Sequence, residues 1–239
     1  MKQRNKIICI IMLLVMSLSI TTPAMGSMIQ ANHLTRVPLQ TSTSAYVTID
    51  FVDCTNQIPI RKEITMPCTE YLALHHDLRA IPKGLSVQET LCAQLAVYQK
   101  HHLVSNDVTP QSFLQKLNKK MQHVTIPNFL KITKPSATII FNAMSAILFN
   151  LQGGKTVVLG LNSFINLIGF DIISFHKGYA STDITTTGML GQQTAPPGNY
   201  VGTMFGFFGY WHGTKVKTGV YSDLTASGFT VFTVWLSTK

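Results

Sequence analysis

Histidine and carboxylate side chains, the commonest metal ligands and acid–base groups, gather in one part of the chain, residues 70–102. Neighbouring residues on a helix point about 100° apart, so the pairs His75-His76 and His101-His102 do not chelate as an i, i+4 pair would. The motifs His-Glu-x-x-His and His-x-x-x-His do not occur. We therefore expect solvated histidine pairs at helix ends, and neither a metal site nor a cofactor, from the full candidate set of Glu70, His75, His76, Asp77, Glu89, His101 and His102.

Hydroxyl nucleophiles are plentiful, but no hydrolase motif accompanies them. The Gly-x-Ser-x-Gly elbow is absent, and Gly153-Gly154-Lys155-Thr156 lacks the upstream glycine of a phosphate-binding loop. His176 and His212 share the C-terminal half with a few aspartates, which is too common an arrangement to indicate a triad. No catalytic residue is predicted, and a hydrolase with an unrecognised Ser/His/Asp or metal site stays an alternative.

A run of aromatic residues separated by glycines spans residues 200–211. Flat rings can stack on the apolar faces of a ligand, so this run is a candidate binding face for carbohydrate or another protein. The alternative is a sheet core in which glycines allow close packing. Segment 185–199, with its glycines and prolines, is interpreted as a long exposed loop beside that face. The candidate ligand-binding residues are Phe205, Phe207, Tyr210, Trp211 and His212.

The first 26 residues have the pattern of a cleavable signal peptide. Three basic residues precede an apolar run that is short for a membrane-spanning helix, and small residues follow at Ala24 and Gly26. We therefore expect an exported protein, extracellular or periplasmic, in a compartment where disulfides form.

Three cysteines follow the signal peptide, and an odd number leaves at least one thiol unpaired. The expected disulfide joins Cys54 to Cys68 around a short loop. Cys92 falls within an amphipathic pattern, where a buried thiol behaves as a small apolar side chain.

Processing leaves a basic protein, because the signal peptide holds three of the 19 basic residues and none of the 10 acidic ones, so the remaining net charge is +6. Such a charge favours an anionic partner surface. A nucleic-acid partner is not expected, because there is no run of five basic residues and no aromatic residues alternate with lysine or arginine.

The N-terminal part is predicted to be a small α+β segment, residues 44–134, after a flexible arm at 27–43. Alternation at 45–51 and 58–66 predicts two strands of a hairpin. Helical patterns follow at 69–78, from a capping box at Ser86 to about residue 102, and from Thr109-Pro110 onward, before a connector at 124–135.

The C-terminal part, residues 135–239, is predicted to be β-rich and sandwich-like. Segment 136–151 is apolar on all sides and fits a buried helix or a long strand, of which we favour the helix. Two strands are expected within 157–175, and further strands at 200–211, 215–221 and 228–236, the last central to a sheet because both its faces are apolar or threonine.

The fold class is therefore α+β, formed by one domain or two. The favoured function is a secreted, non-enzymatic binding or surface/host-interaction protein. A secreted hydrolase is the first alternative and a membrane-active or outer-membrane-associated protein the second, with membrane contact less expected than carbohydrate or protein binding.

Overall fold

The structure is a computed structural model that describes residues 45–56, 58–122, 139–152, 155–159, 170–177, 181–195, 199–217 and 220–238. These described residues belong to one compact unit, so the hairpin and helices share a fold with the β-rich half. The predicted signal peptide at 1–26, the arm at 27–43 and the connector at 124–135 lie outside the described residues.

The predicted N-terminal hairpin is confirmed as β1 (Tyr46–Asp53) and β2 (Ile60–Pro67). The two strands pair antiparallel over their whole length, from Tyr46 opposite Pro67 to Asp53 opposite Ile60. Alternation sends Ile49 and Phe51 to the face that carries the helices, and Asp50 and Val52 to the other face. The opposite edge of β1 pairs with β8 near the C-terminus of the chain.

The expected helices are confirmed as α3 (Cys68–Arg79), α4 (Val87–Lys100) and α5 (Pro110–Met121). The capping box at the start of α4 is formed: Ser86 Oγ accepts from the Glu89 backbone N–H at 3.3 Å, and the Glu89 carboxylate accepts from the Ser86 N–H at 2.8 Å. At α5, the Thr109 hydroxyl accepts from the Ser112 N–H and Pro110 occupies the first helical position. Local capping chemistry therefore fixes where α4 and α5 begin.

The described strands belong to one antiparallel sheet in the order β2-β1-β8-β5-β4-β9-β3-β6-β7. β8 also pairs directly with β9, which closes β8, β5, β4 and β9 into a ring. The α+β class and the β-rich C-terminal half are thus confirmed, with the strands hydrogen-bonded in a single sheet. The C-terminal strands are β3 (Ile139–Gln152), β4 (Lys155–Leu159), β5 (Phe170–Lys177), β6 (Ser181–Gly188), β7 (Gly191–Thr194), β8 (Asn199–Lys217) and β9 (Val220–Thr238).

The helix favoured for 136–151 is wrong, because residues 139–152 form strand β3. Hydrogen bonds join β3 to β9 on one side and to β6 on the other. Phe149 and Leu151 face one core while Ala146 faces the other, so the all-round apolar pattern comes from a strand buried on both faces. Periodicity alone does not separate such a strand from a buried helix.

The long loop expected at 185–199 is also wrong over most of its length. Residues 185–194 belong to the β6–β7 hairpin, with a turn at Met189-Leu190. Buried Asn142 holds this turn: its carboxamide oxygen accepts from the Leu190 N–H at 3.1 Å, and its nitrogen donates to the Gly191 carbonyl at 2.8 Å. A side chain distant in sequence therefore organises the turn.

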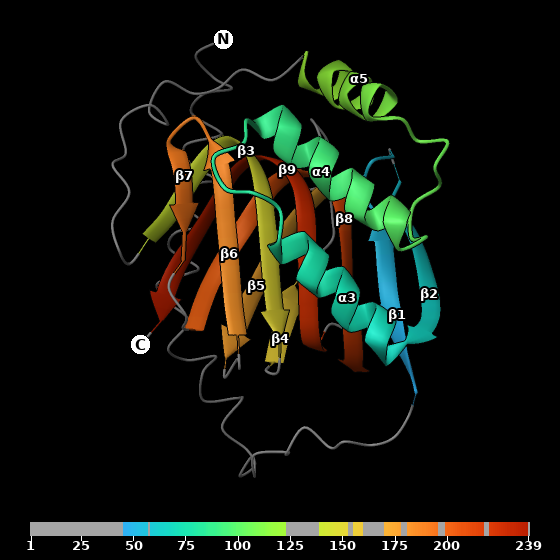
Figure 1. Ribbon diagram of the computed structural model, residues 1–239. Coiled ribbons are helices and arrows are strands. Elements are labelled where there is room, and N and C mark those ends of the chain that lie inside the picture. The colour runs from blue at the N-terminus through green and yellow to red at the C-terminus, as the bar shows by residue number, and fades with distance from the viewer. Residues whose placement is uncertain are drawn as a thin grey trace. The chain divides into compact units, whose positions relative to one another are not determined.

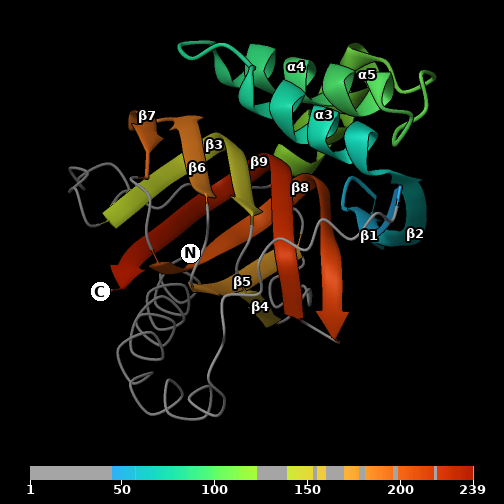
Figure 2. The same cartoon turned by 60° about the horizontal axis from the view of Figure 1, so that its bottom comes forward.

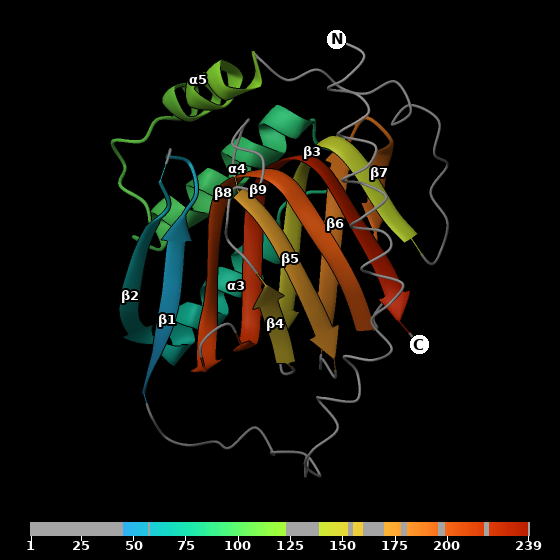
Figure 3. The same ribbon diagram turned by 180° about the vertical axis from the view of Figure 1, so that it is seen from behind.

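Two cores lie on opposite faces of the sheet. The three helices cover one face (Figures 1 and 2), and their core includes Leu74, Leu95 and Phe113. The other face, seen in Figure 3, carries a core around Phe149 and Trp235, whose rings stack with centroids 4.7 Å apart. A side chain at Gly202 would overlap the Trp235 ring, so glycine is required for this close approach.

Candidate functional site

The five candidate ligand-binding residues of the aromatic run lie inside the protein. Phe205 is 8% exposed and the other four are 3% exposed or less. Successive side chains alternate between the two cores, with Trp211 on one face and Tyr210 on the other. The binding face expected at these residues is therefore corrected to the alternative, a sheet core, in which the side chains of Phe205, Phe207, Tyr210, Trp211 and His212 are buried.

The expected Cys54–Cys68 disulfide is also corrected, because both residues are free cysteines, as is Cys92. Cys54 follows β1 at one end of the hairpin, whereas Cys68 follows β2 at the other end. Seven strand positions at about 3.4 Å each separate the two ends by more than 20 Å, far beyond the Cα separation of about 7 Å that a disulfide spans. The residues between the two cysteines include the whole of β2, so they do not form a short loop.

Two histidines that the sequence places far apart, His75 on α3 and His212 on β8, come together beneath the helices. Their ring centroids lie 5.3 Å apart, and Tyr71 contacts the His75 ring edge-on at 4.4 Å. His75 is 1% exposed and His212 is not exposed. The expectation of solvated histidine pairs is right for His76, whose side chain is 82% exposed, and for His102, but it is wrong for the buried His75 and His101.

Neutral side chains hold one nitrogen of each buried ring. The Nδ1 atom of His75 lies 3.0 Å from the Asn150 carboxamide oxygen and 3.3 Å from the Thr225 hydroxyl. The Nδ1 atom of His212 lies 3.4 Å from the Tyr98 hydroxyl, which accepts a hydrogen bond from Ser227 at 3.0 Å. The cluster therefore links α3 and α4 to the strands β3, β8 and β9.

The other nitrogen of each ring, Nε2, is buried and has no hydrogen-bond partner among the described residues. Burial lowers the pKa of His75 to about 4. Burial, and then repulsion from His75, hold the pKa of His212 well below its ordinary value. Both rings are therefore neutral near pH 7.

A second cluster joins α3 to α4 on the outer side of the helix pair. His101 lies between two carboxylates, with Nδ1 2.5 Å from Glu70 Oε1 and Nε2 2.9 Å from Asp77 Oδ2. A carboxylate only accepts hydrogen bonds, so both ring nitrogens donate and the His101 ring is charged in this arrangement. Lys100 donates to the same Asp77 oxygen at 2.7 Å. Hydrogen bonds from Lys100 and His101 lower the pKa of Asp77 to about 2.

Within the described residues, no group of three or more His, Cys, Asp or Glu side chains is arranged to hold a metal ion. Among those same residues, no helix has the length and apolar character that crossing a membrane requires.

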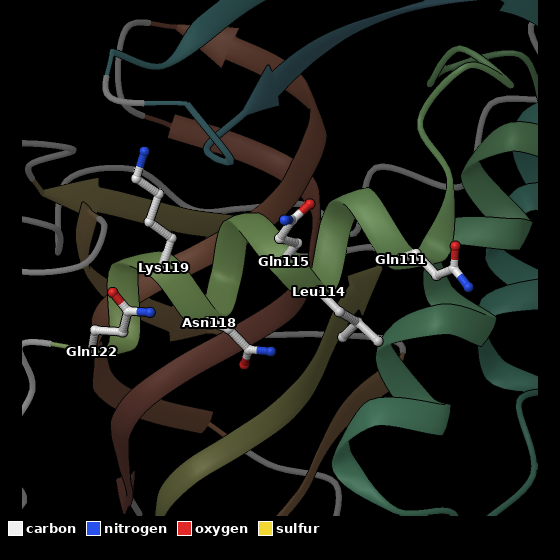
Figure 4. Close-up of a pocket in the computed structure, with 6 residues that line it drawn as sticks. All are labelled: Gln111, Leu114, Gln115, Asn118, Lys119 and Gln122. Atoms are coloured by element: carbon white, nitrogen blue, oxygen red, sulfur yellow. The ribbon is translucent and has the colours of Figure 1, made fainter.

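An exposed groove of about 550 Å³ lies on α5 and its C-cap residue (Figure 4). Four carboxamides follow one another there at i, i+4, i+7 and i+11. At about 100° per residue these positions fall within about 60° of one another around the helix, opposite the buried Phe113 and Leu117. The sequence predicted this helix from its Thr109-Pro110 start, and the polar spacing, which can also be read from the sequence, was missed. The groove is lined by Gln111, Leu114, Gln115, Asn118, Lys119 and Gln122.

In comparisons with known proteins, no family model, curated protein or solved structure matches this chain.

Proposed function

We propose that this is an exported, non-enzymatic binding protein that holds an acidic polysaccharide in the groove on α5. The observation that carries the proposal is the carboxamide stripe: Gln111, Gln115, Asn118 and Gln122 in one line, with Lys119 beside it. Export rests on the signal peptide pattern of residues 1–26.

The chemistry of the stripe matches a chain of sugars. Each carboxamide offers two N–H donors and one oxygen acceptor, which together pair with neighbouring hydroxyl groups on a sugar ring. From Gln111 to Gln122 the stripe extends about 16 Å at about 1.5 Å per residue, enough for an oligosaccharide of several units. A linear array of such groups favours a linear polymer over a small compact ligand.

The charge of α5 favours an acidic ligand. The helix carries three lysines and no acidic residue. Lys120 serves the fold, because its ammonium donates to the Asn56 carbonyl at 3.0 Å and lies 5.0 Å from the centre of the Phe208 ring. Lys116 and Lys119 are exposed, so they are available for a carboxylate or sulfate group of a polysaccharide.

The helix is also a rigid support for binding. Phe113 and Leu117 bury its inner face, and the Phe113 ring lies 5.1 Å from the Phe208 ring of the sheet. Side chains on a fixed helix lose less conformational entropy on binding than side chains on a loop, which supports binding here.

The test is calorimetric titration of the protein with heparin, with uncharged dextran as the neutral comparison. We expect binding to heparin only. The double variant Gln115→Ala/Asn118→Ala removes two hydrogen-bonding groups of about 1 kcal/mol each and should weaken binding about tenfold or more. Lys119→Gln should weaken binding and reduce its dependence on salt.

The matched control is Lys62→Gln, which makes the same charge change at an exposed position on β2, away from α5, and should leave affinity nearly unchanged. Absence of heparin binding by the wild type would overturn the proposal. So would equal weakening by Lys62→Gln and Lys119→Gln, since binding would then follow net charge and not the α5 groove.

A further inference from the structure

We propose that the helix pair α3–α4 is docked on the sheet through an acid-sensitive joint, in which protonation of His75 and His212 loosens the helices from the strands. His75 and His212 are not among the residues that line the α5 groove, so this property does not depend on what the groove binds.

The geometry of the joint disfavours charge. The two imidazoles lie 5.3 Å apart, centroid to centroid, and both are almost completely buried. Their Nδ1 atoms contact only neutral groups, the side chains of Asn150, Thr225 and Tyr98. Two charged rings at this separation would repel each other in a medium that screens weakly.

No carboxylate among the described residues bonds to either ring, and the charged groups around them do not offset a positive charge. On α3, the cation of Arg79 lowers the pKa of His75 further, after the effect of burial. On β9, the charge of Asp223 raises the pKa of the Tyr71 phenol, although burial of that phenol is the larger cause. On α4, burial likewise raises the pKa of Tyr98, so this group stays neutral through the acid range. The strand β3 contributes only the neutral Asn150.

The unpartnered Nε2 atoms point to the same conclusion. A protonated ring carries a donor on each nitrogen, and here the second donor would be buried without an acceptor among the described residues. Opening the interface gives both Nε2 atoms water to bond. Protons therefore bind more readily to the open form than to the docked one.

The helix pair has its own link, which resists acid. Glu70 and Asp77 on α3 hold His101 at the end of α4, and Lys100 also bonds to Asp77. Because the pKa of Asp77 is lowered to about 2, its carboxylate stays charged at pH values where His75 and His212 of the open form are protonated. We therefore expect α3 and α4 to leave the sheet together.

The sign of the pH dependence follows from linkage. In the open form the histidines titrate near pH 6.5, whereas in the docked form His75 has a pKa of about 4. Docking is fully stable above about pH 6.5 and loses stability as the pH falls, because the open form then binds more protons. The opening constant should rise about tenfold per pH unit for each histidine, hence about a hundredfold for the two, over a window that closes near pH 4 for His75.

The experiment is amide hydrogen exchange of the full chain from pH 7 to pH 4.5, corrected for intrinsic exchange rates. Amides of α3 and α4 should show opening constants that rise about a hundredfold per pH unit below pH 6 in the wild type. His75→Asn and His212→Asn each keep a polar group near the original Nδ1 position and cannot take a charge. Each should reduce the slope to about tenfold per unit, and the double variant should remove it.

His102→Asn is the matched control. His102 is exposed just after α4 and has a φ of 57°, a left-handed conformation that asparagine adopts readily, so the slope should be that of the wild type. A wild type whose helix opening does not change between pH 7 and pH 4.5 would overturn the inference without any variant. A double variant that keeps the full slope would also overturn it.

Discussion

The same residue type holds the two sides of the helix pair in opposite ways. On the outer side, His101 lies between Glu70 and Asp77 and joins α3 to α4 as a charged group. On the inner side, His75 and His212 join the helices to the sheet as neutral groups. Both joints use nearly buried imidazoles, so burial alone does not decide the charge of a histidine; the presence of a carboxylate acceptor does.

The two joints are also stabilised by different interactions. The outer joint is held by hydrogen bonds between charged groups at the edge of the solvent. The inner joint is held mainly by apolar packing, and its hydrogen bonds fix the orientation of side chains that are already packed together. The two joints should therefore respond differently to truncation and to acid.

The largest effect is expected at Tyr98, the centre of the inner joint. Its ring is not exposed and contacts Phe51, Tyr210 and His212. Tyr98→Ala should lower the free energy of unfolding by about 3–5 kcal/mol, because it leaves a cavity. Tyr98→Phe should lower it by about 1–3 kcal/mol, because Ser227 and His212 lose their common partner.

Urea unfolding measures both values, and Leu72→Ala provides the control, since Leu72 is a 61% exposed residue on α3. Equal losses of unfolding free energy for Tyr98→Ala and Tyr98→Phe would contradict the claim that packing stabilises this joint more than hydrogen bonding does.

A middle-sized effect is expected from His101→Leu on the outer joint. The substitution removes the cation between Glu70 and Asp77 together with its hydrogen bonds to the two carboxylates. Hydrogen bonds to charged groups are worth about 1.5–3 kcal/mol. Unfolding free energy at pH 7 should fall by that amount. The pH dependence of helix opening described above should remain, because His75 and His212 are unchanged; its loss in this variant would mean that the two joints are not independent.

The smallest effect is expected from Asp77→Asn, and its pH dependence carries the information. The lowered pKa of Asp77, about 2, means that this carboxylate stabilises the fold at pH values above the ordinary value of 3.8 and that the contribution is lost as the pH falls through about 2. The wild type should therefore be more stable than the variant at pH 5, and the difference should shrink between pH 4 and pH 2. Thermal unfolding at pH 5, 3.5 and 2 measures this, and a difference that grew as the pH fell would have the wrong sign.

Local chemistry made the helical layer predictable from the sequence. The capping box at Ser86 and Glu89 and the Thr109-Pro110 start are each complete within four residues, and each forms as expected. The hairpin of β1 and β2 was equally legible, since alternating residues face one core and its neighbours the other.

The failures all involve partners distant in sequence. Residues 139–152 were predicted to be a helix because the strands that pair with β3, and the side chains that cover both its faces, come from distant parts of the chain. The β6–β7 turn depends on Asn142, which is distant in sequence. The pairing of Cys54 with Cys68 was predicted from their sequence spacing, which does not show that the hairpin separates them by its full length. The inner joint was invisible for the same reason: His75 and His212 meet only when α3 packs on β8 and β9.

The hairpin also constrains the order in which the chain assembles. Asp50 on β1 accepts a hydrogen bond from Tyr221 on β9, which is 171 residues further along, and Arg61 on β2 bonds to both. Closing so long a loop must precede any gain from these contacts, so folding rates fall when contacts of this range dominate. The sheet is complete only when β8 and β9 have paired, and until then β1 has an unpaired edge, a feature that favours aggregation.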